Sequence, residues 1–402
     1  MVNLPRPEYP RPTLRRERWS NLNGRWAFAF DDDDRGCAER WQDVTADGLD
    51  GDTPFPRVIT VPFCYQAELS GIGERTRHDV VWYARTFADV RNHPAEHLLL
   101  HFGAVDYRAT VWVNGALVAG HEGGHTPFSA DVTDTLRGGD NVVVVRAEDP
   151  LDDLEIPRGK QYWHLETEGI FYTPTTGIWQ TVWLEPVASA RVTEIRATPD
   201  LDAGCIDVDV TLVGISRGAV LRLVISLRGD VVVDDRMLVT ASRLQRRYPL
   251  LPQAAAVGAE VTKWQGMAAW SPQNPNLYDL RLELQAPDGK PTDAVDSYFG
   301  VRKIEARDGR VQLNNRPFYP RLVLDQGYFP GGLLTAASDA DLRRDIEMAK
   351  DLGFDGARKH QKVEDPRWLY WADRLGFLVW SEMPSPQRYS PEAVRRHTME
   401  WQ

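Results

Sequence analysis

Cysteine is scarce in this sequence, and so are long apolar runs. The chain of 402 residues has three cysteines, Cys37, Cys64 and Cys205, an odd number spread far apart. This usage argues against a disulfide framework or a Cys-x-x-Cys site and suits a reducing compartment. No apolar run reaches membrane-spanning length, and the N-terminal stretch MVNLPRPEYPRPTLRRERW lacks the apolar core of a secretory signal. We therefore expect a cytoplasmic protein without a membrane partner.

Positive charge is also in deficit, since the formal net charge is -11. An acidic surface repels polyanions, so nucleic acid is not an expected partner. Hydrophobic residues make up 42% of the chain and charged residues 26%, which is ordinary for a globular protein of two to four domains. The 14 tryptophans fill much of the core, but planar rings also stack on sugar faces, and their number weakly favours a carbohydrate ligand.

The segments from Trp19 onward are typical of β-structure. Short β-branched or aromatic runs, partly alternating, follow one another as far as Val187. Asn114-Gly115 is a strong signal for a type I′ hairpin. Because no convincing helix interrupts these strands, we predict a jelly-roll β-sandwich over residues 1–188, whose first 18 residues form an extended arm.

A second β block follows the first. Strand patterns recur from Arg191 to about Phe299, with a turn signal at Asp288-Gly289. Its length of about 110 residues fits an immunoglobulin-like β-sandwich. We place this domain at residues 189–300.

The pattern changes again in the last hundred residues, where strands alternate with amphipathic helices. Capping signals at Ser338 and at Asp365-Pro366 mark two helix starts. This alternation indicates a parallel βα array, but a closed barrel needs roughly 250 residues. We therefore expect residues 301–402 to form an incomplete (β/α)8 TIM barrel that stops after about three strands. The expected elements are strands near 320–324, 354–357 and 377–380 and helices at 339–352 and 366–375.

Polar residues follow the expected parallel strands. Arg358 and His360 end one strand, and Glu382 ends the next. Parallel strands bring their carboxyl ends to one edge of the sheet, where α/β folds place binding sites. We expect these side chains to converge and to bind a ligand, with Asp325 after the first strand as a weaker candidate. The structural alternative for each is an ordinary ion pair at the rim of the sheet.

Two other patterns suggest metal sites but are better explained otherwise. The stretch from His121 to His125 matches H-E-x-x-H, which binds zinc only on a helix, and its two glycines argue against a helix. The acidic run Asp31–Asp34 fits calcium ligands, although a solvated loop is the simpler reading. We expect neither a metal nor a cofactor.

Several blocks resemble glycoside hydrolase family 2, which contains β-galactosidases, β-glucuronidases and β-mannosidases. The blocks occur in the family's order and cover nearly the whole chain. They are HFGAVDYRATVWVNGALVAGHEGGHTPFSADVT, TGIWQTVWLE, WSPQNPNLYDLRLEL, YFGVRKIE, LNNRPFY, GARKH and LYWADRLGFLVWSEMP.

The resemblance implies a retaining β-glycosidase that hydrolyses O-glycosyl bonds of a carbohydrate substrate. It puts Arg358 and His360 on the floor of the pocket, and it often has an acidic residue at the position of Glu382. A loop of the first domain reaches over the barrel in this family. The resemblance therefore makes the loop residues Lys160, Trp163 and Glu166 substrate-contact candidates, with domain-interface packing as the alternative. Oligomeric state stays open, a homo-oligomer included.

The sequence departs from the family at the catalytic residues. The family's acid/base glutamate follows an asparagine, and its nucleophile is a glutamate on a later strand. This chain contains no Asn-Glu pair. Retaining hydrolysis needs two carboxyl groups roughly 5–5.5 Å apart. We therefore expect a truncated chain without catalytic residues that is inactive alone, and the alternative is a non-catalytic carbohydrate-binding or scaffold protein. An adhesin-like module is a weaker idea.

Overall fold

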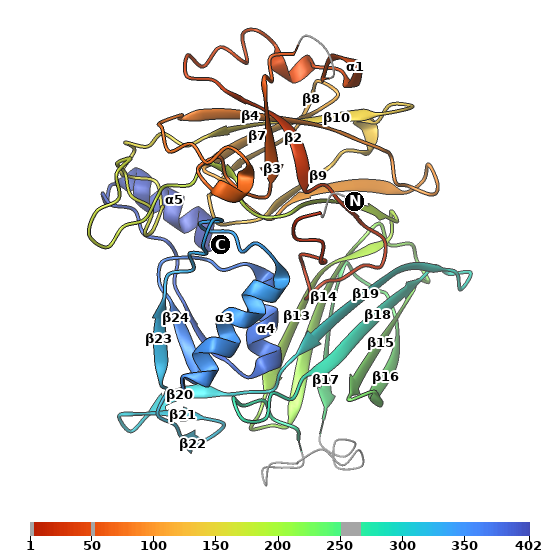
Figure 1. Cartoon of the computed structure of the whole chain (residues 1–402). Coiled ribbons are helices and arrows are strands. Elements are labelled where there is room, and N and C mark those ends of the chain that lie inside the picture. The colour runs from red at the N-terminus through yellow and green to blue at the C-terminus, as the bar shows by residue number, and fades with distance from the viewer. Residues whose placement is uncertain (1–3, 50–52, 251–266) are drawn as a thin grey trace.

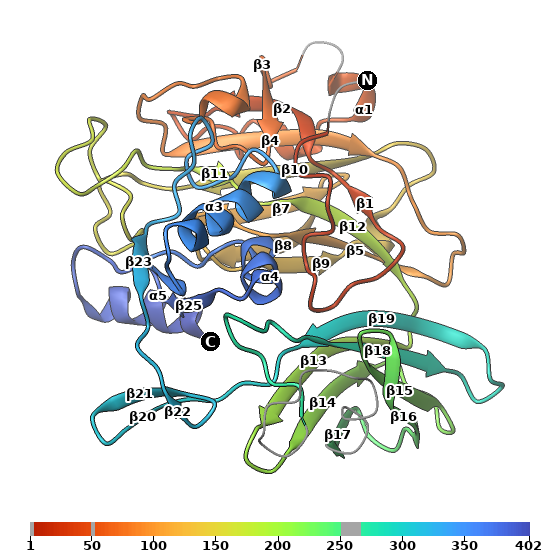
Figure 2. The ribbon, with the colours of Figure 1, turned by 60° about the horizontal axis from the view of Figure 1, so that its bottom comes forward.

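The computed structural model describes residues 4–49, 53–250 and 267–402. Two β-sandwiches and a third region of alternating strands and helices surround an N-terminal arm (Figure 1). We call these parts the first sandwich (residues 19–187), the second sandwich (191–299), the α/β segment (301–402) and the arm (4–18). In Figure 1 the second sandwich and the α/β segment both lie below the first sandwich, and Figure 2 shows the small sheet of β20, β21 and β22 apart from the first sandwich.

The first sandwich pairs a four-stranded sheet, in the order β1-β12-β5-β9, with a six-stranded sheet, in the order β3-β2-β4-β10-β7-β8. A short pair, β6 and β11, lies beside them. The strands are β1 (Ser20–Asn21), β2 (Gly24–Phe30), β3 (Arg57–Val61), β4 (Val80–Phe87), β5 (His97–Phe102), β6 (Val105–Asp106), β7 (Arg108–Val113), β8 (Ala116–Glu122), β9 (Phe128–Asp131), β10 (Asn141–Glu148), β11 (Gly177–Ile178) and β12 (Val182–Val187).

The β7–β8 hairpin turns at Asn114 and Gly115, which both have positive φ, 52° and 82°. The expected type I′ signal is therefore correct. One expectation for this region needs correction, because short helical turns do occur in it: η1 (Trp41–Asp43), α1 (Ala46–Leu49), η2 (Glu68–Ser70) and η3 (Thr133–Thr135). The first two lie over the outer face of the six-stranded sheet, where Trp82 stacks on Trp112. Their apolar side chains shield these rings from water.

The second sandwich pairs β13-β14-β17 with β16-β15-β18-β19. Alternation along β15 is regular, since Leu221, Leu223, Ile225 and Leu227 are fully buried and the residues between them are half-buried. Such a period of two turns one face of the sheet toward the core and the other face outward. The strands are β13 (Arg191–Asp200), β14 (Cys205–Val213), β15 (Val220–Leu227), β16 (Asp230–Leu238), β17 (Arg243–Pro249), β18 (Tyr278–Gln285) and β19 (Pro291–Phe299).

The α/β segment opens with a small antiparallel sheet and continues as a parallel sheet, β23-β24-β25. Helices α3 and α4 pack on one face of that parallel sheet through an apolar core that includes Ile346, Ala357 and Trp368. No helix of the described residues is both long and apolar enough to cross a membrane. The elements are β20 (Ile304–Arg307), β21 (Arg310–Leu313), β22 (Arg316–Pro317), β23 (Leu322–Asp325), α3 (Asp339–Asp351), β24 (Gly356–Lys359), α4 (Pro366–Leu375), β25 (Leu378–Ser381) and α5 (Pro391–Trp401).

Helix starts in this segment follow the local signals, whereas strand ends do not. The Ser338 hydroxyl accepts a hydrogen bond from the Asp341 amide at 3.2 Å, and Asp365 caps α4 in the same way. Strand β24, however, lies two residues later than the expected 354–357. Arg358 and Lys359 belong to the strand because they pair with residues of β23 and β25, and this pairing depends on parts of the chain far away in sequence.

The arm ties the three regions together. The Arg6 guanidinium lies 2.9 Å from Asp365 at the start of α4. Arg16 reaches Asp293 of β19 at 2.9 Å and Glu185 of β12 at 3.1 Å. Both arginines are buried, so the expected extended arm is an internal connector.

Candidate functional site

Arg358, His360 and Glu382 converge at the carboxyl ends of β24 and β25, as the strand pattern predicts. The Arg358 Nε donates a short hydrogen bond to Oε1 of Glu382. The His360 Nδ1 lies 2.7 Å from Oε2 of the same carboxylate, and the amide of Gln361 donates to that oxygen at 3.3 Å. Glu382 therefore joins the two strand ends. We call these three side chains the strand-end cluster.

The surroundings keep Glu382 in its charged form. Its partial burial alone would raise the pKa, but the hydrogen bonds from Arg358 and His360 outweigh that effect and lower the pKa of Glu382. At neutral pH this carboxylate accepts hydrogen bonds and has no proton to give. The cluster can therefore orient a hydroxyl-bearing ligand through charge-assisted hydrogen bonds, but Glu382 is poorly suited as a general acid.

The strand-end cluster lies beside an open face of the parallel sheet. Leu324, Arg358 and Trp380 pair side by side across the three strands and point away from α3 and α4. Trp380 is 60% exposed, and the Arg358 guanidinium lies 5.8 Å from the centre of its ring. An exposed indole next to charged donors is the combination that a sugar ring uses, since one face of a sugar is apolar and its edge carries hydroxyls.

The neighbouring residue, Lys359, points the opposite way and heads a buried network that sequence reasoning missed. Its ammonium group is fully buried, 2.6 Å from Asp325 and 2.7 Å from Glu364. Lys362 lies 2.8 Å from the other oxygen of Glu364. Asp325 therefore belongs to this network, and its backbone carbonyl accepts a hydrogen bond from the His360 amide at 2.8 Å. We call Asp325, Lys359, Lys362 and Glu364 the buried charge network.

The two lysines determine the charge of Glu364. Burial would raise the pKa of this carboxyl, but Lys359 and Lys362 lower it to about 2. Such a network stabilises the fold only while every member is paired. The period of two along a strand was the available signal, because it requires that one of Arg358 and Lys359 faces the helices.

A loop of the first sandwich reaches the carboxyl ends of these strands, as expected. The Gly159 amide donates to the Ser385 carbonyl at 3.0 Å, and the Gln387 side chain donates to the Gly159 carbonyl at 3.0 Å. Gly159 has φ of 61°, and an added Cβ would lie 2.3 Å from the carbonyl oxygen of Gln361. Only glycine fits this approach without displacing the backbone.

The three loop residues singled out from the sequence have different surroundings. Lys160 is buried, with its Nζ 5.2 Å from the centre of the Phe171 ring, so here it packs within the loop. Trp163 is half-buried, 4.8 Å from Phe171 and edge-on to it, and Glu166 is exposed. No hydrogen bond or ion pair links these three side chains to the strand-end cluster within residues 4–49, 53–250 and 267–402. Their contact with substrate stays a prediction.

Tyr172 makes the closer link between this loop and the sheet, and no pattern in the sequence indicated this contact. Its hydroxyl donates to the side chain of Gln326 at 2.5 Å, directly after β23. Its ring stacks on Tyr328 with a centre-to-centre distance of 4.1 Å. Both partners are more than 150 residues away in the chain, so only the tertiary fold brings them together.

The two patterns that suggested metal binding have other structures. His121 lies in strand β8 and its Nε2 is 3.0 Å from the Thr126 hydroxyl, so the stretch is not the helix that H-E-x-x-H requires. Burial lowers the pKa of His125 to about 3. The carboxylate of Asp31 accepts from the amides of Arg35 and Gly36 and from the Trp82 indole. The described residues contain no group of three or more metal-ligating side chains.

Two family models match the chain. "Glycosyl hydrolases family 2, sugar binding domain" matches residues 19–173, and "Glycosyl hydrolases family 2" matches residues 190–302. The chain belongs to glycosyl hydrolase family 2. The resemblance inferred from the sequence blocks is thereby confirmed, and the second model ends where the α/β segment begins.

Curated relatives and solved structures agree with this assignment. A β-galactosidase of Thermoanaerobacter pseudethanolicus is 27% identical over 327 residues, 78% of this chain and 40% of that protein. A β-glucuronidase of Paenibacillus borealis is 25% identical over 428 residues, 97% of this chain and 64% of that protein. Ruminococcus gnavus β-glucuronidase, solved with D-glucuronic acid, has a TM-score of 0.76 at 22% identity over 98% of this chain and 65% of its own, which shows a shared fold. The chain thus spans less than two thirds of these relatives.

Proposed function

We propose that this chain supplies the sugar-binding part of a retaining β-glycosidase that hydrolyses O-glycosyl bonds in carbohydrate metabolism. The observation that carries the proposal is the strand-end cluster, which offers a guanidinium, an imidazole and a carboxylate beside the exposed ring of Trp380. Relatives named β-galactosidase and β-glucuronidase point to a β-glycoside as the substrate.

We further propose that the parallel sheet is the opening of a (β/α)8 TIM barrel. The order β23, α3, β24, α4, β25, α5 and the parallel pairing of the strands support it. On this basis residues 1–188 form a jelly-roll domain, residues 189–300 an immunoglobulin-like domain, and residues 301–402 the first part of the catalytic domain. The open face with Leu324, Arg358 and Trp380 then corresponds to the inside of the barrel.

We also propose that Glu382 and Asp325 cannot carry out the hydrolysis by themselves. Glu382 is held ionised by Arg358 and His360, and Asp325 is paired with Lys359 at 2.6 Å. The sequence contains no Asn-Glu pair to act as the family's acid/base. Without a protonated carboxyl and a free carboxylate on either side of the bond, retaining hydrolysis has neither an acid nor a nucleophile. We expect binding of β-glycosides without turnover.

The test combines an assay with a binding measurement on the 402-residue chain. Aryl β-D-galactoside and aryl β-D-glucuronide should give no product above the blank, and the matching thioglycosides, which resist hydrolysis, should give saturable shifts in NMR spectra. Arg358→Gln should weaken that binding about tenfold through the loss of charge-assisted hydrogen bonds. Arg310→Gln, at an exposed position on β21, is the control and should bind like the wild type. Turnover by the chain, or equal binding by both variants, would refute the proposal.

A further inference from the structure

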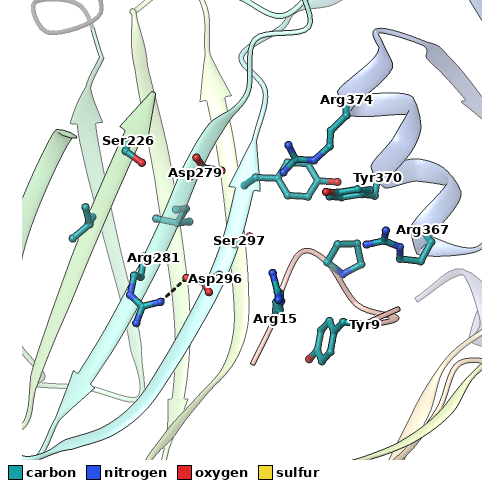
Figure 3. Close-up of a pocket in the computed structure, with 14 residues that line it drawn as sticks. Tyr9, Arg15, Ser226, Asp279, Arg281, Asp296, Ser297, Arg367, Tyr370 and Arg374 are labelled. Carbon is teal, nitrogen blue, oxygen red and sulfur yellow. Dashed lines mark hydrogen bonds and ion pairs between the residues drawn. The ribbon is translucent and has the colours of Figure 1, made fainter. Parts of the chain in front are cut away.

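A second, unrelated cavity lies where the arm, the second sandwich and α4 meet (Figure 3). Its volume is about 540 Å³, within the range of small-molecule sites. Figure 3 shows residues of the strands on one side, residues of α4 on the other, and Tyr9 and Arg15 of the arm between them. None of its lining residues belongs to the strand-end cluster or to the buried charge network.

The strand side of the cavity is the outer face of the second sandwich. Alternation along the strands turns Ser226 of β15, Asp279 and Arg281 of β18, and Asp296 of β19 away from the core. Arg281 lies 2.8 Å from Asp296 and neutralises it. Asp279, in contrast, has no cationic partner in the part of the chain that the structure describes. This wall therefore offers a free carboxylate and a hydroxyl to a ligand.

The helix side of the cavity carries Arg374, which makes no ion pair in the described residues and whose charge partly offsets the effect of burial on the pKa of the adjacent Asp373. Arg374 lies with its guanidinium 4.5 Å from the centre of the Tyr370 ring and 5.6 Å from that of Tyr298. No ion pair of Arg374 occurs among the described residues, whereas Arg367, about two helical turns earlier, is paired with Asp339 at 2.8 Å. The two rings hold the free guanidinium in place next to the cavity.

The arm adds a second free guanidinium. The backbone of Arg15 is fixed to Asp296 by hydrogen bonds of 2.8 and 2.9 Å in both directions. Its side chain lines the cavity, is exposed, and has no ion pair in the described ranges. Two unpaired guanidinium groups from separate elements thus face one unpaired carboxylate across the cavity, with tyrosine rings beside them.

We propose that this cavity is an accessory site for an acidic saccharide, a sugar whose hydroxyl groups accompany a carboxylate. The carboxylate of the ligand pairs with Arg374 and Arg15, which present the planar donors that suit it. Its hydroxyls donate to Asp279 and exchange hydrogen bonds with Ser226, and its ring packs on the tyrosines. A simple anion such as acetate pairs only with the two arginines and is repelled by Asp279. A neutral sugar has no charge to pair with either guanidinium group.

The test titrates the 402-residue chain with sodium D-glucuronate, D-glucose and sodium acetate, followed by calorimetry at fixed ionic strength. Glucuronate should bind at least tenfold more tightly than glucose or acetate, because only it engages both walls. Arg374→Gln should weaken glucuronate binding about tenfold or more. Arg310→Gln should leave this affinity unchanged. The binding should also survive Arg358→Gln, which alters the strand-end cluster alone.

Several results would overturn the proposal. These are the absence of saturable glucuronate binding, equal affinity for acetate or glucose, equal affinity in the wild type and Arg374→Gln, or loss of all glucuronate binding in Arg358→Gln. Thermal unfolding of each variant checks that it folds. If Arg374→Gln does not fold, Arg15→Gln and Ser226→Ala replace it, since both side chains are on the surface of the cavity and neither has a structural partner among residues 4–49, 53–250 and 267–402.

Discussion

Arg358 and Lys359 are adjacent on β24, yet they belong to two different charge clusters. The Arg358 side chain is 44% exposed and shares Glu382 with His360, whereas that of Lys359 is fully buried between Asp325 and Glu364. The alternation of a strand separates them onto opposite faces of the sheet. Adjacent charged residues at a strand end can therefore lie in different environments, one exposed to solvent and one buried within the fold.

The largest expected effect follows removal of a member of the buried charge network. Lys359→Met keeps the length of the side chain but removes the ion pair of Asp325 and leaves Lys362 as the one remaining lysine beside the buried Glu364 in the described residues. We expect the free energy of unfolding to fall by about 3–5 kcal/mol. Urea unfolding measures it, with Arg358→Met on the open face as the matched control, and equal losses in the two variants would remove the distinction between the clusters.

The buried charge network also predicts how stability depends on pH. Because the pKa of Glu364 is about 2 in the folded state and about 4.3 in an unfolded chain, its contribution is complete above about pH 5. It is lost as the pH falls toward 2, and it amounts to something on the order of 3 kcal/mol. Between pH 5 and pH 2 the free energy of unfolding should decline less steeply in Glu364→Gln than in the wild type. Parallel curves would contradict this assignment.

A smaller effect is expected where the loop of the first sandwich meets the strand ends. Gly159→Ala puts a Cβ 2.3 Å from the Gln361 carbonyl and should cost about 2 kcal/mol. Gly169→Ala in the same loop is the matched control, because Gly169 has the same φ of 61° but open space around its Cα. Its cost should be about 1 kcal/mol, from the backbone alone. Thermal unfolding distinguishes the two, and equal costs would show that the loop does not press on the sheet.

The smallest effect on stability should come from the strand-end cluster. Arg358→Gln removes a partly exposed ion pair, so the free energy of unfolding should change by less than about 1 kcal/mol. The affinity for β-glycosides should change much more, because the site and not the fold depends on this side chain. A loss of stability as large as that of Lys359→Met would place Arg358 in the core of the fold.

Local signals in the sequence predicted helices well because their causes are local. Asp365, Pro366 and Gly376 specify the start and end of α4, and the structure has that helix at Pro366–Leu375. The convergence of Arg358, His360 and Glu382 also followed from the strand pattern. The end of β24 was placed two residues early, since pairing with β23 and β25 extends the strand to Lys359.

Contacts between distant segments were out of reach of sequence reasoning. The Arg6–Asp365 pair joins residues 359 apart in the chain, and the partners of Lys359 and Tyr172 depend on how the regions dock. Each is an ordinary polar residue in the sequence, and apart from the strand alternation at Lys359 nothing in its neighbours indicates its partner. Only the packing of the arm and the loop against the α/β segment gives these residues their partners.

The affinity of Glu382→Gln for an aryl β-D-thioglycoside tests the central claim most directly. In a variant that also carries Arg374→Gln, so that the accessory cavity does not contribute, we expect Glu382→Gln to weaken binding about tenfold or more while the free energy of unfolding changes by less than about 1 kcal/mol. Unchanged affinity in a folded variant would contradict the claim that the ends of β24 and β25 form a sugar-binding site.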